Sequence, residues 1–211
     1  MAKTAAALKP LDEAPSAKRQ VIVQAATQVF LESGYGTASM DTIAAVAGVS
    51  KQTVYSHFGA KDALFEAIIE DKCEALLTPV FEPLVPGQDS AEALKEFARR
   101  FLASILMESS SALFRVLVAE CGRFPELAKV FYRAGPATAV KTLGEFLTEL
   151  HAKGALSVPD PTASARQFFA LMRGDLYMRR LLDLTPEPSS AEIDAVVDEA
   201  VSAFLNIHAP E

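Results

Sequence analysis

Residues 34–64, GYGTASMDTIAAVAGVSKQTVYSHFGAKDAL, decide the fold of the N-terminal part of this 211-residue chain. Ser39 is placed to cap a helix, because a serine side chain accepts a hydrogen bond from the first backbone N–H groups. Gly48 follows that helix and supplies the left-handed backbone of a tight turn. A second, shorter helix is expected over residues 51–58. The stretch therefore predicts a helix-turn-helix unit spanning residues 39–58.

The second short helix of this unit has an apolar side and a polar side. Val54 and Phe58 lie four residues apart on the apolar side, and the outward positions are Lys51, Gln52, Thr53 and Ser56. A helix that enters the major groove by its N-terminus reads base edges with such side chains. Lys51 suits guanine O6 and N7, and Gln52 suits adenine N6 and N7. The alternative for Gln52 is a side chain that is simply solvated.

Side chains suited to phosphate oxygens flank this polar side, namely Tyr55, His57 and Lys61. For Tyr55 and His57, packing within the head is the competing interpretation. Lys18 and Arg19 occupy the first turn of an expected helix over residues 18–33, where positive charge opposes the helix dipole. A phosphate partner explains them better than stabilisation of their own helix.

The same stretch matches a known pattern without a gap, at Gly34, Tyr35, Thr37, Ile43, Ala44, Ala47, Gly48, Val49, Ser50, Thr53, Tyr55, His57, Phe58, Lys61 and Leu64. This set resembles the head of the TetR family of transcriptional repressors over about residues 16–76. The resemblance implies that Ser50, Lys51, Gln52 and Thr53 enter the DNA groove and that Tyr55, His57 and Lys61 meet phosphates. Thr37 and Ser39 stand for the usual polar pair and complete the expected DNA-binding set. Ala60 departs from the pattern, which usually has a capping Ser or Asn there.

Composition predicts that the whole chain is all-α. Half of the residues are hydrophobic and 22% are charged, which is typical of a globular protein. Ala, Leu, Glu and Lys dominate, and β-branched residues form no alternating runs. We expect about nine helices, arranged as a three-helix helix-turn-helix domain followed by a C-terminal helical bundle.

The expected organisation has three parts. Residues 1–15 are small, polar and interrupted by prolines, which predicts a disordered arm. Residues 16–76 form the DNA-binding domain, and residues 77–211 form a ligand-binding and dimerisation domain. A linker containing Pro79, Pro83, Pro86 and Gly87 marks the boundary.

Charge is unevenly divided between the parts. The net charge is −7, yet residues 1–62 carry six basic and five acidic side chains, so their sum is +1. The remainder carries 14 basic and 22 acidic side chains, a sum of −8. An acidic body repels phosphate, so DNA contact is expected at the N-terminal end alone.

Nothing in the sequence points to a membrane, a metal or a cofactor. Cys73 and Cys121 are far apart and have no metal-binding or redox spacing. The chain has no apolar run long enough to span a bilayer and no signal-peptide pattern. We therefore expect a cytoplasmic protein with no cofactor and no metal site.

The C-terminal part offers candidates for a ligand pocket and for a dimer contact. An apolar cavity is expected from Phe97, Phe101, Leu117, Phe131, Tyr132, Phe168, Met172 and Tyr177, although such residues at helical spacing are more often plain core. The last helix carries a nearly continuous apolar stripe that suits either a core cap or a partner. The TetR resemblance implies pairing of the last two long helices with a second copy, through Phe169, Leu176, Ile193, Val197, Val201 and Phe204.

Residues 124–136, FPELAKVFYRAGP, are followed by a long apolar helix. That combination is similar to the body of AefR-like regulators. The resemblance as a whole implies a ligand-responsive repressor that binds a palindromic double-stranded DNA operator as a homodimer. A small apolar effector is expected to release it.

Two other classes of function compete with this interpretation. An enzyme built on a helical bundle needs clustered carboxylates and histidines, yet His57, His151 and His208 lie in different segments and no Glu-x-x-His pair occurs. A helical interaction module that binds no DNA leaves unexplained why a helix begins Ser-Lys-Gln-Thr. We therefore expect no enzymatic activity.

Overall fold

The computed structural model describes residues 17–85, 87 and 89–210. The predicted disordered arm over residues 1–15 lies outside them. Every regular element in the described ranges is helical, which confirms the all-α prediction. The N-terminal helices are α1 (Ala17–Thr37), α2 (Met40–Ala47), α3 (Lys51–Phe58) and α4 (Lys61–Phe81). They are followed by α5 (Ser90–Leu106), α6 (Glu108–Cys121), α7 (Pro125–Tyr132), a π-helical turn (Arg133–Ala137), α8 (Thr138–Ala152), α9 (Pro161–Met172), α10 (Asp175–Leu181) and α11 (Ser190–Ile207).

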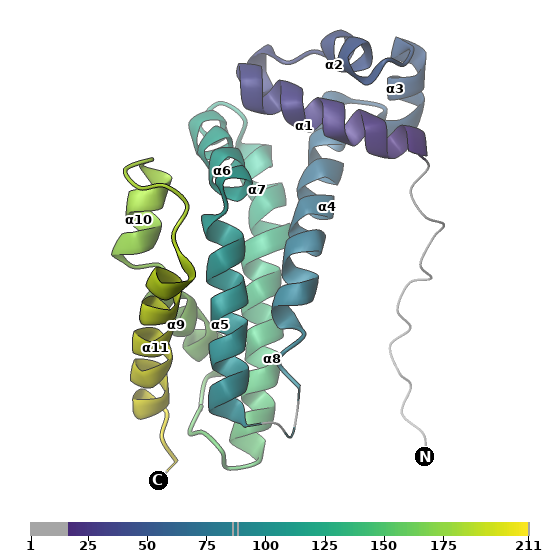
Figure 1. Cartoon of the computed structure of the whole chain (residues 1–211). Helices are drawn as coiled ribbons and strands as arrows, with labels where there is room; N and C mark the ends of the chain where they lie inside the picture. Colours follow the sequence, from purple (N-terminus) through teal and green to yellow (C-terminus); the bar gives the residue numbers. More distant parts are fainter. Residues whose placement is uncertain (1–16, 86, 88, 211) are drawn as a thin grey trace, which may run out of the picture.

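Helices α1, α2 and α3 form a small head at one end of the molecule (Figure 1). The apolar stripe of α1 is buried as its spacing predicts, with Ile22, Ala26 and Phe30 at most 1% exposed. Gly34 breaks the regular helix with a φ of 76°, although one more turn follows before α2. The left-handed conformation of Gly34 therefore kinks the chain and does not end the helix.

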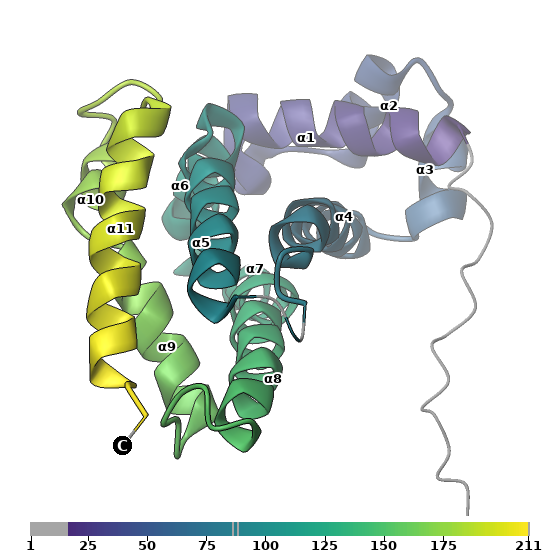
Figure 2. The same ribbon diagram turned by 60° about the horizontal axis from the view of Figure 1, so that its bottom comes forward.

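Helix α4 connects the head to the body and runs beside α5 and α7 (Figures 1 and 2). The sequence placed the beginning of a linker at Pro79, but α4 continues through Pro79 to Phe81. Leu77 and Val80 anchor this last turn in the core of the body. The guanidinium of Arg100 also donates to the carbonyl of Pro79 at 2.9 Å.

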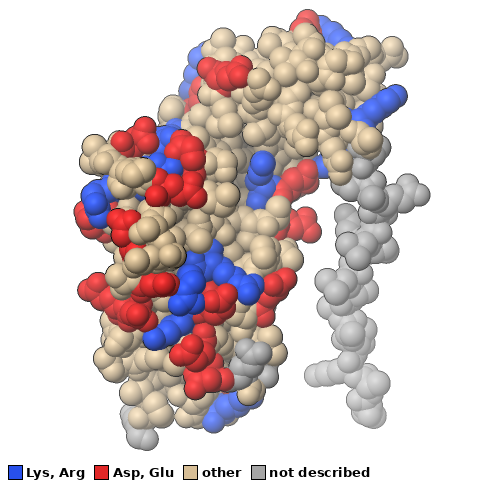
Figure 3. All heavy atoms as spheres, in the orientation of Figure 1, with Lys and Arg blue, Asp and Glu red and all other residues tan. Residues whose placement is uncertain are grey.

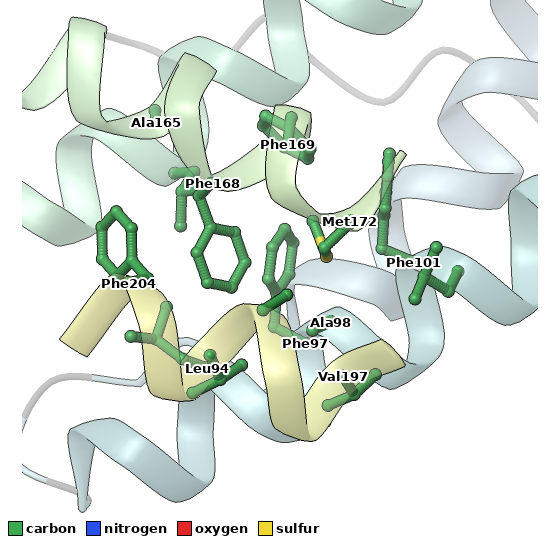
Figure 4. Close-up of a cluster of buried hydrophobic side chains, with 14 of the residues drawn as sticks. Leu94, Phe97, Ala98, Phe101, Ala165, Phe168, Phe169, Met172, Val197 and Phe204 are labelled. Carbon is green, nitrogen blue, oxygen red and sulfur yellow. The ribbon is translucent and has the colours of Figure 1, made fainter. Parts of the chain in front are cut away.

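The body is built from α5, α8, α9 and α11, whose buried faces share one apolar cluster. Figure 4 shows Phe97, Phe168 and Phe204 gathered at its centre, together with Leu94 and Val197. The polar edges of α5 and α11 are joined by ion pairs from Arg99 to Asp194 at 2.7 Å and from Lys95 to Asp198 at 2.8 Å. The long C-terminal helix is thus fixed to its own chain.

The described residues form more helical pieces than the nine expected, and one added break lies at Gly174. Met107 has extended backbone between α5 and α6, and Gly174 separates α9 from α10. Gly135 and Pro136 lie in the π-helical turn that joins α7 to α8. No single described helix is long and apolar enough to cross a bilayer; α5 and α6 reach that length and composition only together, and they are bent by 63°.

A second apolar cluster holds the head against α4, α6 and α7. Leu117 of α6 and Leu127 of α7 are buried in it, beside Phe30 and Phe65. The parts of α6 and α7 around Leu117 and Leu127 therefore pack with the head and not with the core of the body.

Candidate nucleic-acid interface

Two serine caps define the geometry of the α2–turn–α3 unit. The Ser39 hydroxyl accepts from the Thr42 N–H at 3.0 Å, and the Ser50 hydroxyl accepts from the Thr53 N–H at 3.1 Å. Gly48 adopts the left-handed conformation, with a φ of 64°. These contacts confirm the predicted turn chemistry and fix where α3 begins.

Helix α3 presents its polar side to solvent. Val54 is fully buried and Phe58 is half-buried against the head, so the apolar side faces inward as predicted. The first turn of α3 is open to solvent and not packed against the protein. Of the predicted DNA-binding residues, the structure leaves exposed Thr37, Ser39, Ser50, Lys51, Gln52, Tyr55 and His57, and half-buries Thr53.

Lys51, a predicted base-reading residue, is paired within the head. Its ammonium lies 2.7 Å from the Asp41 carboxylate in the first turn of α2, with the two side chains 58% and 64% exposed. The hydrogen bond from Lys51 to Asp41 raises the pKa of the Lys51 ammonium, so the charge is retained. The ammonium also lies 5.8 Å from the centre of the Tyr55 ring. A DNA group at Lys51 would therefore compete with this surface ion pair.

Lys61, a predicted phosphate contact, is half-buried in the head. Its ammonium donates to the carbonyl oxygens of Tyr35 at 2.8 Å and Ala38 at 3.0 Å. It also lies 4.4 Å from the centre of the Tyr35 ring. These contacts hold the connection between α1 and α2, so the structure gives Lys61 a positioning role inside the head. Helix α4 begins without a side-chain cap at Ala60, as its sequence predicts.

Arg19 is also paired with the protein. Its guanidinium forms an ion pair with Asp71 of α4 at 2.7 Å and lies 5.7 Å from the centre of the Phe58 ring. This ion pair joins α1 to α4, and the phosphate contact expected of Arg19 stays a prediction. Lys18, in contrast, is exposed.

The head touches the body at a contact that the sequence did not reveal. The Gly36 N–H donates to the Glu120 carboxylate at 3.3 Å, and the rings of Tyr35 and Phe124 meet edge to face at 4.9 Å. A Cβ atom at Gly34 would lie 2.7 Å from that carboxylate. We name residues 34–36 the GYG segment and residues 120–124 the α6–α7 turn. The only signal in the sequence was the pair of glycines on either side of one aromatic residue.

Tyr35 is the centre of this contact. Its ring is 1% exposed and packs on Phe30 and Phe65 as well as Phe124. Its hydroxyl donates to the Asp62 carboxylate. Burial, followed by this hydrogen bond, raises the pKa of Tyr35 well above its ordinary value, so the phenol stays protonated.

The distribution of charge agrees with DNA contact at the head. On the face seen in Figure 3, acidic and basic side chains crowd the body, while the head is largely uncharged. The polar groups at the opening of α3 thus lie apart from the acidic surface of the body.

Comparison with known protein families decides the identity of this arrangement. Residues 22–68 match the model of bacterial regulatory proteins of the TetR family, and residues 92–210 match the C-terminal domain of AefR-like transcriptional repressors. The chain belongs to the TetR family. It is a DNA-binding transcriptional regulator, and the relatives described below are regulators and not enzymes.

Three similar proteins extend over most of the length of this TetR-family regulator, and a fourth over about half. The structure of the flavonoid-responsive regulator FrrA is 36% identical, with a TM-score of 0.81, covering 90% of this chain and 96% of that one. A TetR-family regulator from Mesorhizobium loti MAFF303099 is 28% identical, with a TM-score of 0.83, covering 93% and 99%. UidR of Escherichia coli K12 is 29% identical over 82% of this chain and 87% of its own length. The transcriptional activator FasR of Mycolicibacterium smegmatis is 34% identical over 100 residues, 47% of this chain and 44% of that protein.

The structure divides the residues expected to line a ligand pocket into two groups. Phe97, Phe101, Phe168 and Met172 of this regulator are at most 3% exposed and point toward one another in the core of the body (Figure 4), and Tyr177 packs against them. Leu117, Phe131 and Tyr132 instead line an apolar groove between α6 and α7. The eight side chains therefore do not surround one common cavity.

The residues expected at a dimer contact are corrected by the structure. Phe169, Leu176, Ile193, Val197, Val201 and Phe204 are between 0% and 7% exposed in the single chain. Their side chains belong to the apolar core of the body, so little of their surface is accessible to a second copy. The apolar stripe of α11 is wide because it caps the core, which was the other possibility that the sequence left open. Exposed apolar side chains in this part of the chain are Leu171, Met178, Leu182, Leu184 and Ile207.

Proposed function

We propose that this regulator is a repressor that binds a palindromic operator as a homodimer and is released by a small planar aromatic molecule. In this proposal residues 16–76 bind DNA, residues 77–211 bind the effector and the second copy, and the protein acts in the cytoplasm. The observation that carries it is the exposed first turn of α3, with Lys51 and Gln52 facing solvent. The match of residues 92–210 to AefR-like repressors supports the sign of regulation.

The dimer contact is proposed on the outward faces of α9, α10 and α11. Large apolar side chains are exposed there, including Met178 at 55% and Ile207 at 65%. The exposed face of α11 carries Ala195, Glu199, Ser202 and Asn206, and the small residues among them allow two helices to approach closely. These helices lie on the side of the body opposite α4 (Figure 1). A pair formed there would use identical surfaces on both copies, as two-fold symmetry requires.

The effector class is proposed from FrrA, whose sequence identity to this chain exceeds that of the Mesorhizobium loti regulator. FrrA is named as flavonoid-responsive and is 36% identical over 90% of this chain. A flavonoid is a planar aromatic molecule with weakly acidic phenols, and it agrees with the apolar effector expected from the resemblance to the TetR family. Release requires that the effector bind the DNA-incompetent state more tightly, with a coupling of about 1–3 kcal/mol.

The experiment uses an operator selected from random duplexes and the probe 7-hydroxyflavone. Wild-type protein is expected to retard the operator and to release it as the probe is added. A reporter gene behind the operator should be silent without the probe and active with it. A reporter that needs the protein for expression would contradict repression and favour activation, the role for which FasR is named.

The dimer is tested with the paired substitution Leu171→Glu and Met178→Glu, compared with Val85→Glu, whose side chain is 45% exposed in a loop away from these helices. Sedimentation should show monomers for the paired substitution and dimers for Val85→Glu. Dimers in both proteins would reject this surface.

A further inference from the structure

The groove between α6 and α7 is an apolar site that the DNA-binding head does not use. Its volume is about 470 Å³, within the range of small-molecule sites, about 300–1,000 Å³. We call it the α6–α7 groove, and its lining is almost wholly apolar: Phe114, Leu117, Val118, Cys121, Ala128, Lys129, Phe131 and Tyr132. Leu117 is 4% exposed at the floor, while Val118 and Tyr132 are 55% and 61% exposed at the mouth.

The lining suits a flat aromatic molecule with one acidic group. Phe114 and Phe131 face each other with ring centres 5.5 Å apart, inclined at 50°, and Tyr132 adds a third ring. Aromatic rings favour offset or edge contacts with another aromatic ring. Among the lining residues, Lys129 alone carries a charge, and its ammonium is held by an exposed ion pair with Glu126 at 2.7 Å. Such surface pairs are weak, so an anionic ligand group can replace Glu126.

The groove is connected to the head through its own lining. Leu117 belongs to the apolar cluster that holds the head. Cys121 in the groove directly follows Glu120, whose carboxylate accepts from the Gly36 N–H. Phe124, at the end of the same turn, contacts Tyr35 of the head. A molecule that separates α6 from α7 therefore displaces the α6–α7 turn from the GYG segment.

We propose that the α6–α7 groove binds a planar aromatic molecule with an acidic phenol or carboxylate, and that filling it loosens the contact between the α6–α7 turn and the GYG segment. This inference rests on the effector class proposed above and adds the site and the route to the head. A second copy of the chain is the competing occupant, because Val118 and Tyr132 are exposed.

Alkylation of Cys121 by iodoacetamide, followed by mass spectrometry, reports occupancy of the groove. Cys73 is an internal control, because its half-buried thiol has a pKa raised to about 11 by burial and alkylates slowly. At 7-hydroxyflavone concentrations ten times the Kd, Cys121 should react about tenfold more slowly, since the free fraction alone reacts. The same reaction rate with and without bound probe would overturn the proposal.

Matched substitutions test whether the probe binds in the groove or elsewhere on the surface. Val118→Glu places a charge at the mouth of the groove, and Val85→Glu places the same charge on a side chain of similar exposure elsewhere, 55% and 45% respectively. Calorimetry should show loss of probe binding in the Val118→Glu protein alone, and its operator should no longer be released by the probe. Circular dichroism and operator retardation without probe confirm that both proteins are folded.

The remaining outcomes each reject the groove in a different way. If the probe releases the operator from both variants and leaves Cys121 reactive, the effector binds elsewhere and the proposed function stands. If the probe does not bind wild-type protein, the effector class fails together with the groove. If Cys121 is protected without probe and becomes reactive on dilution, the occupant is a second copy.

Discussion

The ammonium of Lys51 in the first turn of α3 lies 2.7 Å from a carboxylate oxygen of Asp41 in the first turn of α2. Both side chains are exposed, so the pair is weakened by solvent and by salt. The pair nevertheless holds the ammonium of Lys51 beside the first turn of α2. The residue proposed to read guanine is thus kept in place by an anion that DNA must displace.

Asp41→Asn removes this competing anion and keeps the size of the side chain. The affinity for the operator should rise, by less than about fivefold because the pair is on the surface. The gain should shrink as salt is added, since screening weakens the pair in the wild-type protein. Fluorescence anisotropy over a salt series measures both effects. Glu32→Gln removes an equally exposed acid from α1; an equal gain in that protein would show a general effect of charge.

Lys61→Met tests the role that the structure gives to Lys61. The change removes two hydrogen bonds to backbone carbonyls and should lower the free energy of unfolding by about 1.5–3 kcal/mol. Urea denaturation measures this loss, and the exposed Lys72 in the Lys72→Met protein provides the control. The salt dependence of DNA binding should equal that of wild type. A stable protein with a shallower salt dependence would instead identify Lys61 as a phosphate contact.

The short-range features of the head were predictable from the sequence. Ser39 and Ser50 cap helices through bonds to the backbone three residues away, and Gly48 adopts the conformation that its turn requires. Each of these contacts lies within a few residues of its origin. Local sequence therefore contains all the information that they need.

Long-range partners were not predictable in the same way. The spacing of charges along α1 and α4 shows no sign that Arg19 pairs with Asp71, 52 residues away. The apolar stripe of α11 showed which face is buried but not what covers it, and Val197 proved to pack in its own chain. An amphipathic pattern fixes the buried face and leaves the partner open, which is why the dimer residues needed correction.

Glu120→Gln tests the contact between the body and the GYG segment. The neutral amide accepts a weaker hydrogen bond from the Gly36 N–H, so this N–H should exchange with solvent about fivefold faster. Hydrogen exchange of peptides covering residues 30–40, followed by mass spectrometry, gives the rate. Glu126→Gln changes an exposed carboxylate on α7 and should leave exchange unaltered. Equal rates in wild type and Glu120→Gln would show that Glu120 does not hold the head.

The raised pKa of the Cys73 thiol predicts a loss of folding stability at alkaline pH. Burial, with a smaller contribution from Glu70, raises the pKa of its thiol from 9.0 to about 11. Because the folded state holds the proton more tightly, the stabilisation is complete below pH 9 and is lost as the pH rises through 11. The loss should be about 1–2 kcal/mol, after allowance for the partial exposure of the sulfur to solvent.

The measurement for Cys73 is urea unfolding at pH 8 and at pH 11. Wild type should lose more stability between the two than Cys73→Ala, which has no thiol to ionise. Cys121→Ala should behave as wild type. If Cys73→Ala and wild type decline equally, titration of Cys73 does not affect folding.

Selection of bound sequences from random duplexes tests most directly whether two copies of the protein read DNA symmetrically, each with the exposed first turn of its α3. Wild-type protein should enrich a two-fold symmetric sequence whose half-sites are separated by a whole number of helical turns, each about 34 Å. Gln52→Ala should keep the spacing and lose preference at one position in each half-site. An asymmetric enriched sequence, or identical preferences for wild type and Gln52→Ala, would contradict the account.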